Sequence, residues 1–124
     1  STARINITDE NQINSPNVVK VVVNSQGYAL YFSRSTIPCA DRKEAVFYKH
    51  LGIYAYRRNF LQSLSELKPS ELEKVEGLEQ LRFLENGISI RVMQVFDESP
   101  HVDTQEDVAR VTPLLENSAK ELEE

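Results

Sequence analysis

Two short apolar runs on either side of a turn sequence constrain the fold of this chain more than any other feature. Residues 18–23 are rich in β-branched valine, which is typical of a largely buried strand. Residues 24–27, Asn-Ser-Gln-Gly, supply turn chemistry, and residues 28–32 then return to apolar and aromatic side chains. The pattern predicts a β-hairpin made by these two runs.

Other segments also show the patterns of strands, and polar stretches separate them. Strand patterns alternate apolar with polar residues or form short apolar and aromatic runs. The intervening stretches are polar or irregular, and each contains a proline that disfavours regular structure. Strands are therefore expected at residues 1–8, 51–56 and 88–93, and loops at residues 9–17 and 33–49.

Helical spacing and end signals predict two helices between the strands at 51–56 and 88–93. Apolar residues between positions 60 and 67 share one helical face, and Pro69 ends that helix. Ser70 and Glu73 then form a capping box, in which each side chain bonds a free backbone N–H of the first turn. The second helix is expected to continue to about Glu85 and to end at the Asn-Gly pair that follows.

A third helix is predicted near the carboxyl end of the sequence. Thr104 and Asp107 have the spacing of another capping box, and Pro113 is expected to kink or interrupt the helix that they begin. Mixed strands and helices place the chain in the α/β or α+β class. Its 124 residues suit a single domain, residues 1–124.

Composition excludes several classes of function. No apolar stretch approaches the roughly 18 residues of a membrane span. A net charge of -5 argues against a nucleic-acid-binding protein, which needs a basic face. Two histidines and one cysteine are too few and too scattered for a Cys/His zinc site. Because the single cysteine, Cys39, also fits a reducing compartment, we expect a soluble cytoplasmic protein without a membrane partner.

The four glycines of the chain stand alone, and no glycine-rich turn is present. A backbone that cradles nucleotide phosphates needs such a turn for close approach. We therefore expect any nucleotide phosphates to be held by residues outside this sequence.

Glu79 is the carboxylate that the helical pattern singles out. In a continuous helix it falls inside an apolar arc, and Gln80 falls near the edge of that arc. A carboxylate in such a place needs a partner, because desolvation of its charge is unfavourable. Two readings remain open from spacing alone: an ion pair with Arg82, or a ligand-facing role. The arc consists of Leu72, Val75, Leu78, Leu81 and Phe83.

Four other positions have both a functional and a structural interpretation. Asp103 precedes the predicted third helix, where it can favour the positive helix end or bind Mg²⁺. Arg34 and Arg42 carry planar guanidinium groups that suit a carboxylate, although arginines in loops are commonly solvated. His50 lies just before a predicted strand and is either a ligand or a solvated or packed side chain.

Four stretches in the same order and spacing carry a resemblance to a known family. They are Val-Lys-Val-Val with Gly-Tyr-Ala-Leu-Tyr-Phe-Ser-Arg and Ile-Pro within residues 19–38, His-Leu-Gly-Ile-Tyr-Ala-Tyr-Arg at 50–57, Leu-Glu-Gln-Leu-Arg at 78–82, and Val-Asp-Thr-Gln-Glu-Asp at 102–107. Together they resemble the 3-deoxy-manno-octulosonate cytidylyltransferases over nearly the whole chain. The resemblance matches the carboxyl-terminal half of that family.

The resemblance implies a Rossmann-like nucleotide-sugar transferase fold of the α/β class, with a mixed sheet and flanking helices that is incomplete in this chain. It implies a homodimer that transfers CMP from CTP to 3-deoxy-manno-octulosonate for lipopolysaccharide synthesis, with Mg²⁺ and release of pyrophosphate. It also implies Asp103 as one of two magnesium-binding aspartates. The residues that it places in the sugar pocket are Arg34, Arg42, His50, Tyr54, Glu79 and Gln80.

The sequence departs from the family pattern in three places. Gln105 stands where the family has proline, His101 stands where it commonly has glycine, and residues 38–42 form a shorter stretch than in many relatives. The family's phosphate-binding loop and second metal aspartate are absent, so we expect these 124 residues alone to lack activity. Two other readings stay open: a cytidylyltransferase for a related acidic sugar such as an acylneuraminate, and a non-catalytic assembly module.

Overall fold

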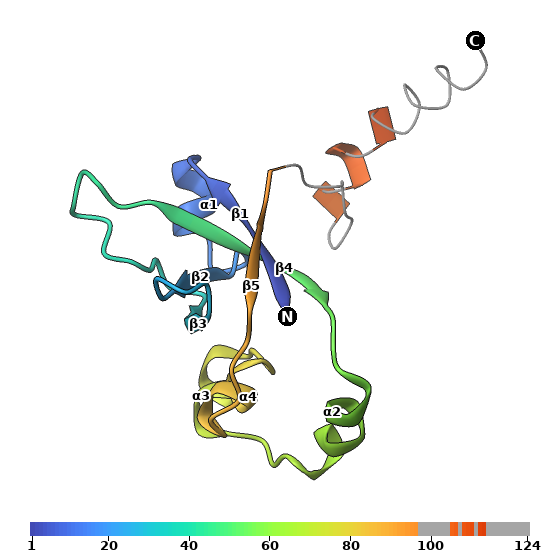
Figure 1. Ribbon diagram of the computed structural model, residues 1–124. Coiled ribbons are helices and arrows are strands. Elements are labelled where there is room, and N and C mark those ends of the chain that lie inside the picture. The colour runs from blue at the N-terminus through green and yellow to red at the C-terminus, as the bar shows by residue number, and fades with distance from the viewer. Residues whose placement is uncertain (97–104, 107, 111, 114–124) are drawn as a thin grey trace.

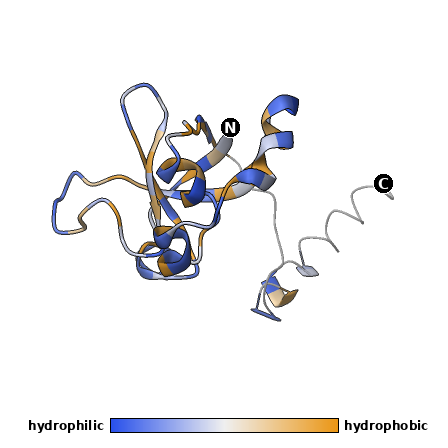
Figure 2. Ribbon diagram, turned by 90° about the horizontal axis from the view of Figure 1, so that it is seen from below, coloured by the Kyte–Doolittle hydropathy of each residue, from blue (hydrophilic) through white to orange (hydrophobic). Residues whose placement is uncertain are grey.

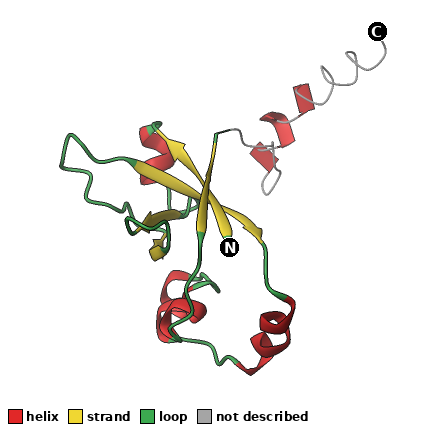
Figure 3. Cartoon of the chain, viewed as in Figure 1, coloured by secondary structure: helices red, strands yellow, loops and turns green. Residues whose placement is uncertain are grey.

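The computed structural model describes residues 1–96, 105–106, 108–110 and 112–113. Within these residues the strands form one mixed sheet, on which short helices pack (Figures 1 and 3). Its order is β3-β2-β4-β1-β5; β1 pairs with β5 in parallel, and the other neighbours are antiparallel. The α/β expectation is confirmed. The strands are β1 (Thr2–Ile7), β2 (Lys20–Val23), β3 (Ala29–Ser33), β4 (Phe47–Tyr54) and β5 (Val92–Val95).

The predicted hairpin is confirmed as β2 and β3. Val21 lies opposite Phe32, and both side chains are buried. The Asn24 side-chain oxygen accepts from the backbone N–H groups of Gln26 and Tyr28, and Gly27 adopts a positive φ of 83°. Glycine takes this conformation without the steric penalty of a side chain, so the local sequence is sufficient to specify the turn.

The predicted strands are found, but two have shifted bounds. β4 begins at Phe47, earlier than the expected start at residue 51, and ends at Tyr54. Residues 47–50 are Phe-Tyr-Lys-His, and the strand extends over them because they pair with β1. β5 begins at Val92; Ile90 and Arg91 instead bond β3 and β1 through their main-chain carbonyls.

The expected loop at residues 9–17 contains a short helix, α1 (Glu10–Asn14). The Asp9 carboxylate accepts from the backbone N–H of Asn11 and caps this helix. Ile13 is buried with Ile7 and Phe47 in a small second core. The sequence shows no apolar periodicity for this helix, because Ile13 is its one buried residue.

The two predicted central helices are each divided. The first is α2 (Arg58–Ser63) followed by a 3₁₀ turn, η1 (Leu64–Glu66). The second is α3 (Glu71–Glu76) and α4 (Leu81–Glu85), so the expectation of one helix to Glu85 is wrong. The capping box at the start of α3 is confirmed, as is the carboxyl-terminal cap after α4. Gly77, with φ 65°, ends α3 in the left-handed conformation.

The break at Gly77 removes the apolar arc that was drawn around Glu79. Val75 is 81% exposed and Leu72 is 41% exposed, whereas Leu78 and Leu81 belong to the core. Of the two readings left open for Glu79, the ion pair with Arg82 is not found among the described residues. Arg82 instead forms a bidentate pair with Glu73 of the capping box.

The main core lies between the β2–β3 hairpin, the α3–α4 region and the start of β5. Its fully buried members include Phe32 and Leu81. Apolar and hydrophilic residues alternate along the elements in Figure 2, as expected for strands and helices with one buried face. Thr104 and Asp107, the second capping box, lie outside the described residues. Among the helices that the structure describes, none has the length and apolar character needed to cross a membrane.

Candidate functional site

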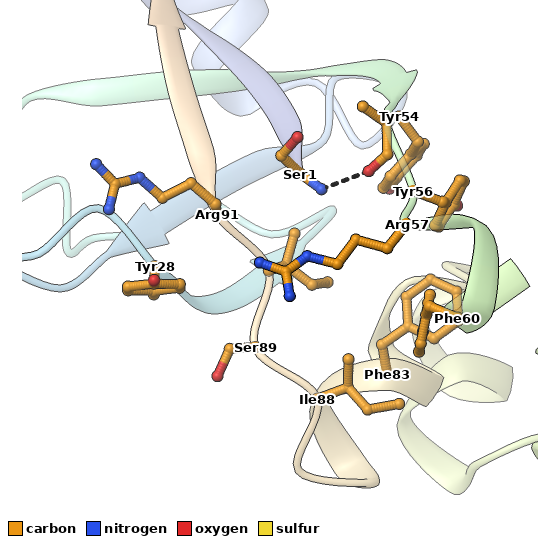
Figure 4. Close-up of a pocket in the computed structure, with 12 residues that line it drawn as sticks. Ser1, Tyr28, Tyr54, Tyr56, Arg57, Phe60, Phe83, Ile88, Ser89 and Arg91 are labelled. Atoms are coloured by element: carbon orange, nitrogen blue, oxygen red, sulfur yellow. Dashed lines mark hydrogen bonds between the residues drawn. The ribbon is translucent and has the colours of Figure 1, made fainter.

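A cavity of about 530 Å³ opens where the end of β4 faces α4 and the segment before β5 (Figure 4). Aromatic side chains form much of its wall, with two arginines and two serines as the polar groups. Small-molecule sites commonly combine an apolar wall with a few polar groups in this way. The lining residues are Ser1, Tyr28, Tyr54, Ala55, Tyr56, Arg57, Phe60, Phe83, Ile88, Ser89, Ile90 and Arg91.

A continuous series of aromatic rings runs from the core to this cavity. His50 stands edge-on to Phe32, with ring centroids 4.9 Å apart, and lies 5.5 Å from Tyr54. Tyr54 and Tyr56 are stacked, with centroids 5.7 Å apart, and Tyr56 is followed by Phe60 at 6.1 Å. Because each ring packs on the next, the orientation of Tyr54 at the cavity depends on the rings of Phe32 and His50 behind it.

His50 is a neutral side chain at the base of the series. Burial lowers its pKa to about 4. Its Nε2 lies 2.9 Å from the Thr2 hydroxyl oxygen, and that hydroxyl donates to the main-chain carbonyls of Leu51 and Ile53. The Thr2 hydroxyl proton is therefore directed to these carbonyls and not to His50. This favours the tautomer in which His50 Nε2–H donates to the Thr2 oxygen and Nδ1 is an acceptor.

The pKa of His50 predicts a stability that depends on pH. The unfolded side chain titrates near 6.5 and the folded one near 4, so between these values the unfolded state binds more protons. The free energy of unfolding should therefore fall by about 3 kcal/mol as the pH drops from about 7 to about 4, because each pKa unit is worth about 1.4 kcal/mol. Chemical denaturation of the wild type and of His50→Gln at several pH values measures this. If the variant keeps the same slope between pH 4 and 6.5, another group is responsible.

Tyr54 and Tyr56 present protonated phenols near the cavity. The pKa of Tyr54 is raised, first by burial and then by the neighbouring Tyr56, with a smaller effect of Glu79. The pKa of Tyr56 is raised by burial and by the charge of Glu79. Both hydroxyls therefore remain donors at neutral pH.

Two arginines of the cavity were not singled out by sequence reasoning. Arg57 follows β4 directly, and Figure 4 shows its side chain extending toward the segment before β5. Arg91 comes from that segment, and its guanidinium lies 5.4 Å from the centre of the Tyr28 ring. No aspartate or glutamate is among the lining residues in the described part of the chain. The cavity therefore favours an anionic ligand.

The structure brings some of the predicted sugar-pocket residues together. Tyr54 lines the cavity, His50 packs on Tyr54, and Glu79 influences the tyrosine pair. Gln80 is 8% exposed at the start of α4. Of these four residues, only Tyr54 is among those that line the cavity; His50, Glu79 and Gln80 are not.

Arg34 and Arg42 are placed differently from the other predicted residues. Arg42 is exposed in the loop between β3 and β4. Arg34 directs three guanidinium nitrogens to main-chain carbonyls, those of Pro16, Glu76 and Gly77. Neither arginine is among the residues that line the cavity.

The predicted metal ligand Asp103 lies outside the described residues. Within the described ranges, no group of three or more histidine, cysteine, aspartate or glutamate side chains is arranged to hold a metal ion. The magnesium site therefore stays a prediction from the resemblance.

Comparison with known proteins gives matches that agree with one another. A family model described as "Cytidylyltransferase" matches residues 1–90. The 3-deoxy-manno-octulosonate cytidylyltransferase of Chlorobium phaeobacteroides (strain BS1) is 49% identical over 105 residues, which are 83% of this chain and 42% of the relative. The protein of the same name from Polynucleobacter necessarius subsp. necessarius (strain STIR1) is 49% identical over 123 residues, 95% of this chain and 48% of the relative.

A solved structure gives a similar result. The structure of CMP:2-keto-3-deoxy-manno-octonic acid synthetase complexed with CTP is 43% identical, with a TM-score of 0.87. The match covers 94% of this chain and 48% of that chain. The chain thus spans just under half the length of the curated relatives and the solved structure that it matches.

Proposed function

The chain belongs to the cytidylyltransferase family, and from this we propose that the intact protein transfers CMP from CTP to 3-deoxy-manno-octulosonate. The anomeric hydroxyl oxygen of the sugar loses its proton to water and forms a bond to the α-phosphorus, the bond from that phosphorus to the bridging oxygen breaks, and pyrophosphate leaves. Displacement of this kind depends on positioning and on neutralisation of charge. The proposal is supported most directly by the 43% identity and TM-score of 0.87 to the synthetase complexed with CTP.

We infer that these residues supply the sugar-binding half of the protein, corresponding to the carboxyl-terminal half of the family. The cavity chemistry supports this role. The phenols near the cavity are hydrogen-bond donors, and the exposed carboxylate of Glu79 can accept from sugar hydroxyls. His50 holds Tyr54 in place, and Gln80 lies next to Glu79.

An acidic sugar fits the charges of the cavity better than a neutral one. Arg57 and Arg91 line it. Guanidinium groups bind carboxylates through paired hydrogen bonds as well as charge. The carboxylate of the substrate is therefore proposed to lie toward the arginine side of the cavity, and its hydroxyls toward Tyr54 and Glu79.

We further infer that the intact protein uses Mg²⁺, with Asp103 as one ligand, and that it is a homodimer, both of which the family resemblance implies. We also infer from the single cysteine that it acts in the cytoplasm. Magnesium would neutralise phosphate charge in the displacement. The exposed apolar side chains of Ile53 and Met93 on the described sheet are consistent with a partner surface.

Release of pyrophosphate by the intact protein tests the proposed function. With CTP and magnesium, we expect kcat/KM for 3-deoxy-manno-octulosonate to exceed that for an acylneuraminate by about a hundredfold or more, since a site matched to polar groups rejects poor fits strongly. Equal or greater activity with the acylneuraminate would favour the related acidic-sugar enzyme. Absence of pyrophosphate with every acidic sugar would favour an assembly module. These outcomes separate the three readings.

A further inference from the structure

Arg34 and Glu76 are joined to each other in both directions. The Arg34 Nε donates to the main-chain carbonyl of Glu76 at 2.7 Å, and its Nη2 donates to that of Gly77 at 3.3 Å. In return, the Glu76 carboxylate accepts from the backbone N–H of Arg34 at 3.0 Å. Each side chain thus holds the main chain of the other residue, and we call this arrangement the reciprocal clamp.

The Glu76 carboxylate also binds the end of β3. It accepts from the Ser33 hydroxyl at 2.7 Å and from the Tyr31 hydroxyl at 3.2 Å. Burial opposes ionisation of Glu76, but the hydrogen bonds from Arg34, Ser33 and Tyr31 outweigh it and keep its pKa below the usual range. Glu76 is therefore a charged acceptor at neutral pH, and charged acceptors make the stronger hydrogen bonds.

Arg34 is also fixed from the side of the β2 strand. Its main-chain carbonyl accepts from the ammonium group of the buried Lys20 at 2.8 Å. Its Nη1 donates to the carbonyl of Pro16 at 2.9 Å. The reciprocal clamp is thus attached to the hairpin and to the loop before β2, and it has little freedom to move.

The clamp ends next to two of the proposed sugar ligands. Gly77 is followed by the buried Leu78, then by Glu79 and Gln80. The break between α3 and α4 at Gly77 leaves this segment outside both helices. Its position is therefore set by the contacts at its two ends, which are the clamp and the core.

We propose that Glu76 is a positioning residue for the sugar site: with Arg34 it forms the reciprocal clamp that fixes residues 77–80, the segment that carries Glu79 and Gln80. Glu76 itself does not touch the substrate. The effect of the clamp on sugar binding rests on the proposed function. The effect of the clamp on the position of residues 77–80 does not depend on that function.

Glu76→Gln in the intact protein tests the inference, because glutamine has the same shape and lacks the charge. We expect the KM for the sugar to rise about tenfold, while kcat and the KM for CTP change less than about twofold, as for loss of binding that is uniform in ground and transition states. Glu71→Gln is the matched control, since Glu71 lies on the same helix and pairs only with the exposed Lys74 in the described structure. An equal rise in the KM for CTP, or an unchanged KM for the sugar, would overturn the inference.

Arg34→Lys provides a second test if Glu76→Gln folds poorly. Lysine keeps the charge but cannot donate to the carbonyls of Pro16, Glu76 and Gly77 with a planar fork. The clamp predicts the same rise in KM for the acidic sugar and for an analogue whose carboxylate is replaced by an alcohol. A rise confined to the acidic sugar would overturn the clamp and assign Arg34 to direct carboxylate binding.

Amide hydrogen exchange separates failure of the inference from failure of the proposed function. In Glu76→Gln, exchange at Leu81 and Arg82 should become faster, because these amides bond to the carbonyls of Leu78 and Glu79 within the positioned segment. Exchange in β1 and β4 should stay unchanged. Faster exchange in a protein with no activity on any acidic sugar would support the clamp and reject the proposed function. Unchanged exchange at both amides would reject the clamp whatever the activity.

Discussion

Replacing Asp103 by asparagine in the intact protein is expected to lower kcat/KM by about a hundredfold or more, because metal-bridged stabilisation of phosphate is worth several kcal/mol and each 1.4 kcal/mol is about tenfold in rate. Asparagine keeps the size of aspartate and much of its ability to cap a helix, so the protein should still fold. Raised magnesium should restore part of the activity. The measurement is steady-state pyrophosphate release at several magnesium concentrations.

Glu79→Gln is the contrasting variant for this experiment. It should raise the KM for the sugar about tenfold, through loss of charged hydrogen bonds, and leave the dependence on CTP and magnesium nearly unchanged. Its stability should stay close to that of the wild type, because Arg82 is paired with Glu73 and not with Glu79. Near-normal turnover of Asp103→Asn at ordinary magnesium would argue against the metal assignment.

Lys20→Met is expected to have the largest effect on stability, about 4 kcal/mol in the free energy of unfolding, because removal of one side of a buried polar cluster leaves its partners unsatisfied. Lys20 is 0% exposed, and its ammonium group donates to the main-chain carbonyls of Ser15, Val18 and Arg34. Methionine fills a similar volume and offers no donor. Urea denaturation of the intact protein monitored by circular dichroism gives the difference.

Lys74→Met is the control for Lys20→Met. Its ammonium group is on the surface, where it pairs with Glu71, and such exposed pairs contribute at most about 1 kcal/mol. A loss of stability in Lys20→Met no larger than in Lys74→Met would show that the three carbonyls find other donors.

The local features of the fold could be predicted from the sequence. The β2–β3 hairpin, the capping box at Ser70 and the cap after Glu85 each depend on residues within a few positions of one another. The division of the second helix could not be predicted in this way. Gly77 is tolerated within many helices, and here its left-handed conformation is favoured by contacts of Glu76 and Gly77 with the distant Arg34.

The predicted sugar-pocket residues stay a prediction from the resemblance, because a site built from distant segments depends on contacts that local patterns do not specify. The resemblance pointed to His50 and Tyr54, whose rings lie 5.5 Å apart, and to Glu79. Spacing alone placed Glu79 in the apolar arc of one continuous helix. This placement was wrong, because the chain forms two helices, α3 and α4, and Glu79 lies between them. Arg57 and Arg91 lie 34 positions apart in the sequence, and only the fold shows that they line the same cavity.

The position of β1 in the sheet has a consequence for the order of folding. This first strand lies between β4 and β5, so its partners run from Phe47 to Tyr54 and from Val92 to Val95. Closing such long loops costs more chain entropy than closing the short turn of the β2–β3 hairpin, and a high contact order slows folding. On a ribosome, β1 would emerge before β4 and β5 and would acquire its β5 neighbour only after residue 95 had emerged. The hairpin can form early and locally, whereas the centre of the sheet has to wait for nearly the whole described chain.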